Sequence, residues 1–407
     1  MPESTRSLSD ESFSALDPAL KGGRWVEVFN DLRNARPVAH SKAHEDGFYV
    51  ITRYEDVLYA LRHPELYASC PVTIPAFGNP RPMIPIEIDP PMHRVYRAPL
   101  NGFFARKRQR ELEPEYRAAA ARLIDAFVGR GHGDLSSEFC YPLPVSTIMT
   151  MFDIPTRDRA HLVELINAQV HQVGAIDNPD EAARSAAAIA LQMYEYFAGL
   201  IPSRRAGTGN DLLSVLAHAD IGGSPLHDDE IVDYSLVAIS AGFETTANTL
   251  GYSLLYLSEH PDTRRALADD PELVPSFVEE LLRWETPTKG LARTVVAEHE
   301  IGGTMLRRGD RVLLLYASAN RDPGEFDDPE HFDMKRRPNP HLSFGQGPHV
   351  CLGMHMARSE LKAALGEFLT RIPDFEIDRS ALVENTGTTW SLTSLPATWP
   401  LPATAAS

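Results

Sequence analysis

Apolar positions recur with a helical period over most of the chain. The longest such stretch runs from Asp228 to Glu259 and begins with acidic residues, which favour a helix N-terminus. About 32 residues at 1.5 Å each give a helix of roughly 48 Å, long enough to cross a whole domain. A second helix is predicted from Met354, after which Leu361 and Leu365 lie at helical spacing.

Shorter elements are predicted elsewhere. The pattern predicts a helix at 54–61 and successive helices over 115–206, two of them linked at 174–179. Residues 36–52 resemble two short strands around a turn, and residues 387–396 predict a hairpin with Ser391-Leu392 near its tip. Most of the predicted elements are helices.

Length and composition suit one large globular unit. The chain has 407 residues, of which 43% are hydrophobic and 23% are charged, so it can bury a sizeable core. Its 32 prolines are spread throughout and mark many turns rather than one linker. We therefore expect a single domain over residues 1–407, with flexible ends at 1–14 and 401–407.

Charge and cysteine content exclude several classes of function. The formal net charge of −17 argues against nucleic acid or an anionic membrane as the main partner. No run of about 18 apolar residues predicts a membrane span, and the N-terminal residues lack the apolar core of a signal peptide. Three scattered cysteines form no disulfide framework. These features predict a soluble protein of the reducing cytoplasm.

The segment from His341 to Gly353 holds a cysteine between glycines, just before the helix predicted from Met354. Backbone N–H groups and the helix dipole at that position favour the thiolate form of Cys351. Glycines such as Gly345 allow a strained loop and let a flat ligand approach the backbone. A cysteine taken alone is more often a buried apolar residue, but a thiolate in such a loop is what axial ligation of haem iron requires.

The long helix has an unusual centre. Between Asp233 and Glu259 the only charged residue is Glu244, which lies in the string Ala-Gly-Phe-Glu-Thr-Thr at 241–246. An interior glycine costs about 1 kcal/mol, and a buried carboxylate costs more. Threonine hydroxyls can bond back to helix carbonyls, and a local bulge would open a groove. Above haem iron, Glu244 and Thr245 would suit O2 binding and proton delivery; alternatively, the string is a structural kink.

Two further pairs lie at helical spacing. His93 and Arg97, at i and i+4, share one face and could bind a carboxylate such as a haem propionate, although a charged surface helix is the simpler interpretation. Glu280 and Arg283, at i and i+3, form a pair that is common on ordinary helices.

A basic cluster stands out in this acidic chain. It comprises Arg106, Lys107, Arg108 and Arg110, and Arg94 on the preceding helix could extend it. Such a cluster is either a solvated helix face or a docking surface for an acidic electron donor.

These motifs together resemble those of the cytochromes P450. The pattern Phe-Gly-x-Gly-x-His-x-Cys-x-Gly is filled at every specified position from Phe344 to Gly353, and the central string of the long helix matches the family's acid–threonine motif. The Glu-x-x-Arg motif is also present. The resemblance covers roughly residues 15–400 and implies one mainly α domain with a smaller β-rich part, with haem b between the long helix and the cysteine loop.

The resemblance also implies roles for individual residues. Glu244 and Thr245 would be catalytic, and Cys351 would be the iron ligand. Haem contacts, with the propionates included, would come from His93, Arg97, Arg293, Phe344, His349, Cys351 and Gly353. The irregular, proline-rich segment 70–91 and other elements would line a substrate pocket with Ile74, Phe77, Val237, Ala241 and Leu291. Glu280 and Arg283 would form a structural ion pair, with His331 where many relatives have arginine.

The implied activity is that of a monooxygenase of the soluble bacterial type. It would insert one oxygen atom from O2 into a small apolar substrate such as a terpenoid, steroid or aromatic compound. No flavin or iron–sulfur segment is visible in the sequence, so a separate ferredoxin-type donor and an NAD(P)H-dependent reductase are implied. The alternatives are a peroxide-driven peroxygenase on the same fold and a non-enzymatic haem sensor or electron carrier.

Overall fold

The computed structural model describes residues 12–44, 46–76, 81–168 and 179–401. Its α-helices are α1 (Arg24–Ala35), α2 (Tyr54–Arg62), α3 (Met92–Asn101), α4 (Arg106–Phe127), α5 (Pro142–Met151), α6 (Thr156–Asn167), α7 (Pro179–Ala206), α8 (Leu212–Ala217), α9 (Asp228–Glu259), α10 (Pro261–Asp269), α11 (Val274–Glu285), α12 (Tyr316–Ala319) and α13 (Met354–Arg371).

The strands are short. They are β1 (Val38–Ser41), β2 (Phe48–Ile51), β3 (Tyr67–Ala68), β4 (His132–Asp134), β5 (Leu291–Val295), β6 (His299–Ile301), β7 (Thr304–Leu306), β8 (Arg311–Leu314), β9 (Glu376–Ile377), β10 (Val383–Asn385), β11 (Ser391–Ser394) and β12 (Pro396–Thr398). The mainly α fold with a smaller β-rich part agrees with the sequence analysis.

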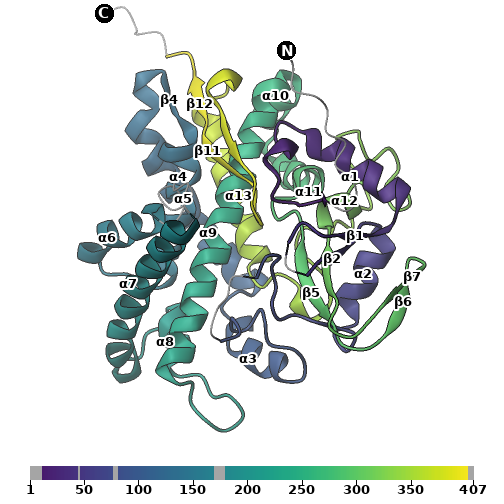
Figure 1. Ribbon diagram of the computed structural model, residues 1–407. Helices are drawn as coiled ribbons and strands as arrows, with labels where there is room; N and C mark the ends of the chain where they lie inside the picture. Colours follow the sequence, from purple (N-terminus) through teal and green to yellow (C-terminus); the bar gives the residue numbers. More distant parts are fainter. Residues whose placement is uncertain (1–11, 45, 77–80, 169–178, 402–407) are drawn as a thin grey trace, which may run out of the picture.

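Helix α9 runs through the middle of the molecule, with α4 to α8 on one side and the main sheet, α1 and α2 on the other (Figure 1). Its bounds are those predicted. The backbone N–H of His227 donates to Glu230 in a capping box, and Pro261 follows the last turn. From Thr246 to Leu254 every residue is buried, because protein surrounds this half of the helix.

The predicted bulge in α9 is absent from its centre. The helix is a continuous α-helix, although the Thr245 hydroxyl donates to the Ala241 carbonyl at 2.8 Å and the Thr249 hydroxyl donates to the Thr245 carbonyl at 2.7 Å. These bonds satisfy the hydroxyls without breaking the helical ladder, so the expected distortion does not follow.

The main sheet has the order β1-β2-β8-β5-β3, in which β2 and β8 are parallel and the other neighbours are antiparallel. The irregular segment predicted at 70–91 has no helix or strand in its described residues. Glu87 organises it, because its carboxylate accepts the backbone N–H groups of Val72 and Met83, both at 2.8 Å.

Two predictions near the termini need correction. The C-terminal hairpin pairs β10 with β11, so Ser391 and Leu392 lie in a strand rather than at the tip. At the other end Phe13 is buried and Ser14 Oγ lies 2.7 Å from His44 Nε2. The flexible N-terminal end predicted at 1–14 therefore does not include Phe13 and Ser14. Within the described chain, no helix is long and apolar enough to cross a bilayer.

Candidate active site

The cysteine loop is closed by its own backbone and held against α2. The Cys351 N–H donates to the Phe344 carbonyl at 2.8 Å. Gly347 has a φ of 72°, and a Cβ there would lie 2.2 Å from the carbonyl oxygen of Leu61. The glycine is therefore required both for the left-handed backbone and for this close approach.

Cys351 is exposed, yet burial raises the pKa of its thiol. The Gly353 N–H and the charges of Arg97 and Arg358 favour the thiolate, as expected for a helix N-terminus, but burial outweighs them. A bound cation would reverse this balance, because a coordinating thiol is deprotonated outright.

Four predicted propionate contacts converge beside this loop. The rings of His93 and His349 have centroids 4.1 Å apart. Burial lowers the pKa of His349 to about 3, and the charges of Arg293 and Arg97 add to this effect. His93 and Arg293 are also buried. The histidines are therefore neutral, whereas Arg97 and Arg293 are cations that require anionic partners, and the two carboxylates of haem b would suit them.

Two further residues of this group were not predicted from the sequence. Ser69 Oγ lies 3.0 Å from His349 Nε2, and the Ser69 N–H donates to Asp89 at 2.9 Å. Asp89 itself lies 3.9 Å from the same His349 nitrogen. Ser69 directly precedes the irregular segment 70–91 and Asp89 lies near its end, so both ends of this segment approach His349.

Helix α9 packs against α13, the helix that follows the cysteine loop. Phe243 and Ala247 share a hydrophobic cluster with Met356 of α13, and Leu352 packs against the same cluster. Ser240 and Ala241 are exposed, although the helical turns before and after them are largely buried. The donor set itself fits a haem, because it offers one cysteine for the iron and cationic or neutral nitrogen donors for two carboxylates.

Glu244 differs from the other buried acids. It makes no hydrogen bond to any residue in the described part of the chain, and burial raises the pKa of its carboxyl to about 7. Near neutral pH it therefore exchanges a proton readily. Its negative charge acts on Tyr141, whose hydroxyl donates to Asn248 at 3.1 Å.

The Glu280–Arg283 ion pair is present and fully buried, with Arg283 Nη2 at 2.7 Å and Nε at 2.9 Å from the carboxylate. The predicted third member is different. His331 contributes only its backbone carbonyl, at 3.3 Å from Arg283, whereas the second cation on Glu280 is Arg336 at 3.2 Å. Asn339 also donates to Glu280.

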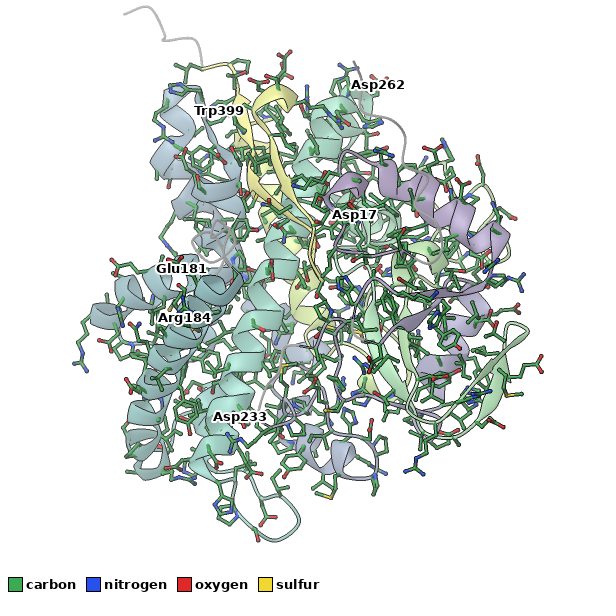
Figure 2. All side chains as sticks on the ribbon, in the orientation of Figure 1. Asp17, Glu181, Arg184, Asp233, Asp262 and Trp399 are labelled. Atoms are coloured by element: carbon green, nitrogen blue, oxygen red, sulfur yellow. The ribbon has the colours of Figure 1, made fainter. Side chains whose placement is uncertain are left out.

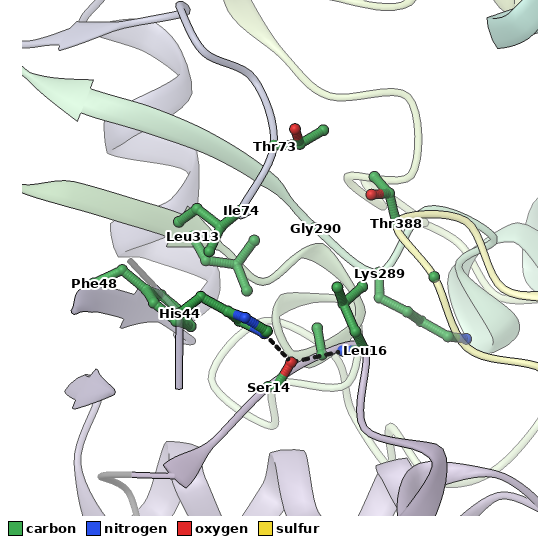
Figure 3. A pocket seen from close by; sticks show the side chains of 12 residues that line it. Ser14, Leu16, His44, Phe48, Thr73, Ile74, Lys289, Gly290, Leu313 and Thr388 are labelled. Carbon is green, nitrogen blue, oxygen red and sulfur yellow. Dashed lines mark hydrogen bonds between the residues drawn. The ribbon is translucent and has the colours of Figure 1, made fainter. Parts of the chain in front are cut away.

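The predicted substrate residues lie at separate places. Val237 and Ala241 are one turn apart on α9, and Leu291 begins β5, paired with Leu314. Ile74 instead packs in the core with Phe48 and Leu313. It lines a small pocket with Ser14 and His44, which Figure 3 shows. Phe77 lies outside the described residues.

The basic cluster lies at the start of α4, which packs along α13. Its exposed members are Arg94, Arg106, Lys107 and Arg110. Arg108 is engaged within the protein, because it donates to the Asn210 carbonyl at 3.1 Å and lies 4.3 Å from the Phe103 ring centre. Burial lowers the pKa of His355 in the first turn of α13, and the charge of Arg106 adds to this effect.

Comparison with known proteins agrees with this arrangement. A family model described as Cytochrome P450 matches residues 201–381. The steroid C26-monooxygenase of Mycolicibacterium smegmatis is 35% identical over 363 residues, 88% of this chain and 88% of that protein. The methyl-branched lipid omega-hydroxylase of Mycobacterium tuberculosis is 32% identical over 98% of this chain and 96% of its own length.

Solved structures extend the likeness to three dimensions. The histidine-tagged, open cytochrome P450 EryK from S. erythraea matches with a TM-score of 0.87 and 29% identity, covering 96% of this chain and 100% of that one. With such relatives over most of its length, this chain belongs to the cytochrome P450 family of monooxygenases.

Proposed function

We propose that Cys351 ligates the iron of haem b and that the enzyme inserts one oxygen atom from O2 into a small apolar substrate. The observation that carries this proposal is the packing of α9, the helix that bears Glu244 and Thr245, against α13, the helix that begins just after the Cys351 loop. The bound haem would supply the iron centre that binds and reduces O2. The propionates would be held by His93, Arg97, Arg293 and His349.

Proton supply is the task of α9. Glu244 is half protonated near its pKa of about 7, so it can deliver a proton at neutral pH and take another from solvent. The Thr245 hydroxyl donates its hydrogen to the Ala241 carbonyl, which leaves its lone pairs free to accept. Thr245 could therefore accept a hydrogen bond from a protonated group in the site, and Glu244 would supply further protons.

The decisive experiment replaces Thr245 by alanine. Product formed per NAD(P)H consumed should fall severalfold in T245A, with the lost electrons recovered as hydrogen peroxide. T249A is the matched control, because Thr249 makes the same backbone bond one turn further along, at a buried position. Unchanged coupling in T245A would remove Thr245 from proton delivery. Equal product from peroxide alone would favour the peroxygenase alternative.

The proposed substrate class rests on the apolar character of the predicted pocket residues and on the names of the relatives. Val237, Ala241 and Leu291 offer no charge to a ligand, and two of the similar proteins are named for steroid and methyl-branched lipid oxidation. We therefore place steroids and branched lipids first, ahead of terpenoids and aromatic compounds. A library screened for the low-to-high-spin shift of the haem should give its strongest shifts in these two classes; shifts confined to aromatic compounds would reverse the order.

Electrons would come from a ferredoxin-type donor served by an NAD(P)H-dependent reductase. The supporting observation is that the exposed cations of α4 lie along α13, the helix that begins just after the cysteine loop. Reversing Lys107 to glutamate should raise the apparent KM for the ferredoxin severalfold at low salt, with little effect at high salt. Arg122→Glu, at another exposed position of α4, is the control. Equal effects of both changes would argue against the cluster.

A further inference from the structure

Glu279 lies one residue before the acid of the Glu-x-x-Arg motif and has a separate set of partners. Its carboxylate accepts Nε of Arg358 at 2.6 Å and Nη2 at 2.8 Å, a two-pronged contact. The ring Nε2 of His341 lies 3.2 Å from the same carboxylate. Although burial opposes it, these contacts hold the pKa of Glu279 at about 2.

The two partners flank the cysteine loop on opposite sides in the sequence. His341 is the residue from which the loop segment starts, and Arg358 lies in the second turn of α13, after the loop has ended. One carboxylate on α11 therefore ties together both ends of the segment that carries Cys351. Its neighbour Glu280 pairs instead with Arg283 and Arg336, because consecutive helix residues point about 100° apart.

The clamped arginine also contacts the loop directly. The guanidinium carbon of Arg358 lies 4.4 Å from the centre of the Phe344 ring, and the His341 ring centroid is 5.9 Å from that ring. Phe344 in turn accepts the backbone N–H of Cys351. The charge of Arg358 favours the Cys351 thiolate. An ordinary surface ion pair has none of these connections to the ligand loop.

We propose that Glu279, His341 and Arg358 form a clamp of positioning residues that fixes the cysteine loop beneath the haem. The clamp rests on the proposed function, because it has a role only where Cys351 ligates the iron. It acts through Phe344 and the loop backbone rather than by touching the reacting atoms. Loss of either charged member should loosen the loop and weaken haem retention.

The test compares E279Q, R358M and R358K with the parent holoenzyme. Two signals are measured: the rate of haem transfer to apomyoglobin, and the fraction of the ferrous carbon monoxide complex with the red-shifted, thiolate-type band. We expect E279Q and R358M to lose haem about tenfold faster, as for other residues that orient a metal ligand, and to lose part of that band. R358K keeps the charge but not the planar fork, so it should fall in between.

Arg371→Met is the matched control. Arg371 lies on the same helix, is about as exposed (30% against 32%) and pairs with Asp125 and Glu367 far from the loop. It should leave both signals at the parent level. If R358M does not fold, E279Q and R358K still decide the matter.

The possible results distinguish a failure of the clamp from a failure of the ligation by Cys351. Suppose that the parent shows the thiolate-type band and that E279Q and R358M match it in both band and haem-loss rate. This result would overturn the clamp and leave the ligand assignment intact. A parent without that band overturns the ligation by Cys351, and the clamp falls with it. Equal acceleration in R371M would reduce the effect to general destabilisation of α13, which also overturns the proposal.

Discussion

The two sides of the candidate haem site are built differently. On the cysteine side, Glu279 and Glu280 together engage three arginines, a histidine and an asparagine. On the α9 side, Glu244 has no hydrogen-bond partner in the described chain, and the adjoining turn at Ser240 and Ala241 is exposed. Glu279 and Glu280 on the cysteine side thus have fixed hydrogen-bond partners, whereas Glu244 on the α9 side has none in the described chain.

This difference follows from what each side must do. Ligation requires one fixed geometry, which a network of buried, hydrogen-bonded charges provides because removing any partner leaves an unpaired charge behind. Proton transfer requires groups that can change their partners, and a carboxyl without a fixed bond can do so. The mere presence of charged side chains does not show this contrast, since they occur in many parts of the view in Figure 2, with Asp233 on α9 and Asp17 and Asp262 on other elements.

The largest expected effect comes from changing the ligand itself. Cys351→His should abolish the thiolate-type carbon monoxide band and reduce product formation below detection, because imidazole is a neutral ligand. The spectrum of the reduced carbon monoxide complex measures this. Cys70→Ser, at a half-buried cysteine, should leave the spectrum unchanged. A retained band in the histidine variant would refute the ligand assignment.

Next in size is the buried ion pair of α11. Glu280→Gln should lower the free energy of unfolding by about 3–5 kcal/mol, since Arg283 stays buried without its charged partner. The control is Asp262→Asn, which breaks an exposed pair with Arg265 at the same spacing and should cost less than about 1 kcal/mol. Denaturant unfolding measures both, and similar costs would mean that the cysteine side is not specially fixed.

A third prediction concerns pH and the acid Glu360 of α13. Burial raises its pKa to about 7, and Thr147 is its hydrogen-bond donor at 2.8 Å. Because the folded pKa lies above the unfolded one, stability is full below about pH 4.5 and falls as pH rises through 7. In Glu360→Gln, the decrease in the free energy of unfolding with rising pH should be smaller by roughly 3 kcal/mol. Unfolding measured at pH 5 and pH 8 would show it; an unchanged slope would mean that Glu360 ionises freely.

The smallest effect is expected in the segment 70–91, close to the propionate contacts. Glu87→Gln leaves one amide oxygen for the two backbone N–H groups of Val72 and Met83, so one buried donor loses its partner. This should cost about 1–3 kcal/mol of stability. Proteolysis of the native protein should also become faster within 70–91. Stability equal to the parent would show that water replaces the lost acceptor.

Local patterns predicted those parts of the site that depend on neighbours in the sequence. The bounds of α9, the helix after Cys351 and the Glu280–Arg283 pair all arise from spacings within one helix or loop. The sequence analysis chose His331 rather than Arg336 as the third member of the Glu280–Arg283 group. The side chain of Arg336 reaches the Glu280 carboxylate, whereas His331 contributes only its backbone carbonyl, and the sequence does not distinguish these two cases.

Contacts between distant segments left no signal at all. Ser69 approaches His349 across 280 residues, and Glu279 meets Arg358 across 79. The bulge in α9 was predicted from its composition, yet Thr245 and Thr249 satisfy their hydroxyls within a regular helix. Whether a helix with an unfavourable sequence becomes distorted depends on the packing around it, which is a property of the whole fold.

The hydrogen bond from Thr245 to the carbonyl of Ala241 has a consequence for redesigning the enzyme. The bond uses the backbone of residue 241 and leaves its side chain exposed, so that position can be enlarged without disturbing the threonine. Valine at 241 would add two carbon atoms to the side chain and leucine three, and both would narrow the space next to α9. A graded series at this position would thus alter which substrates fit while the proton-delivering hydroxyl stays where it is.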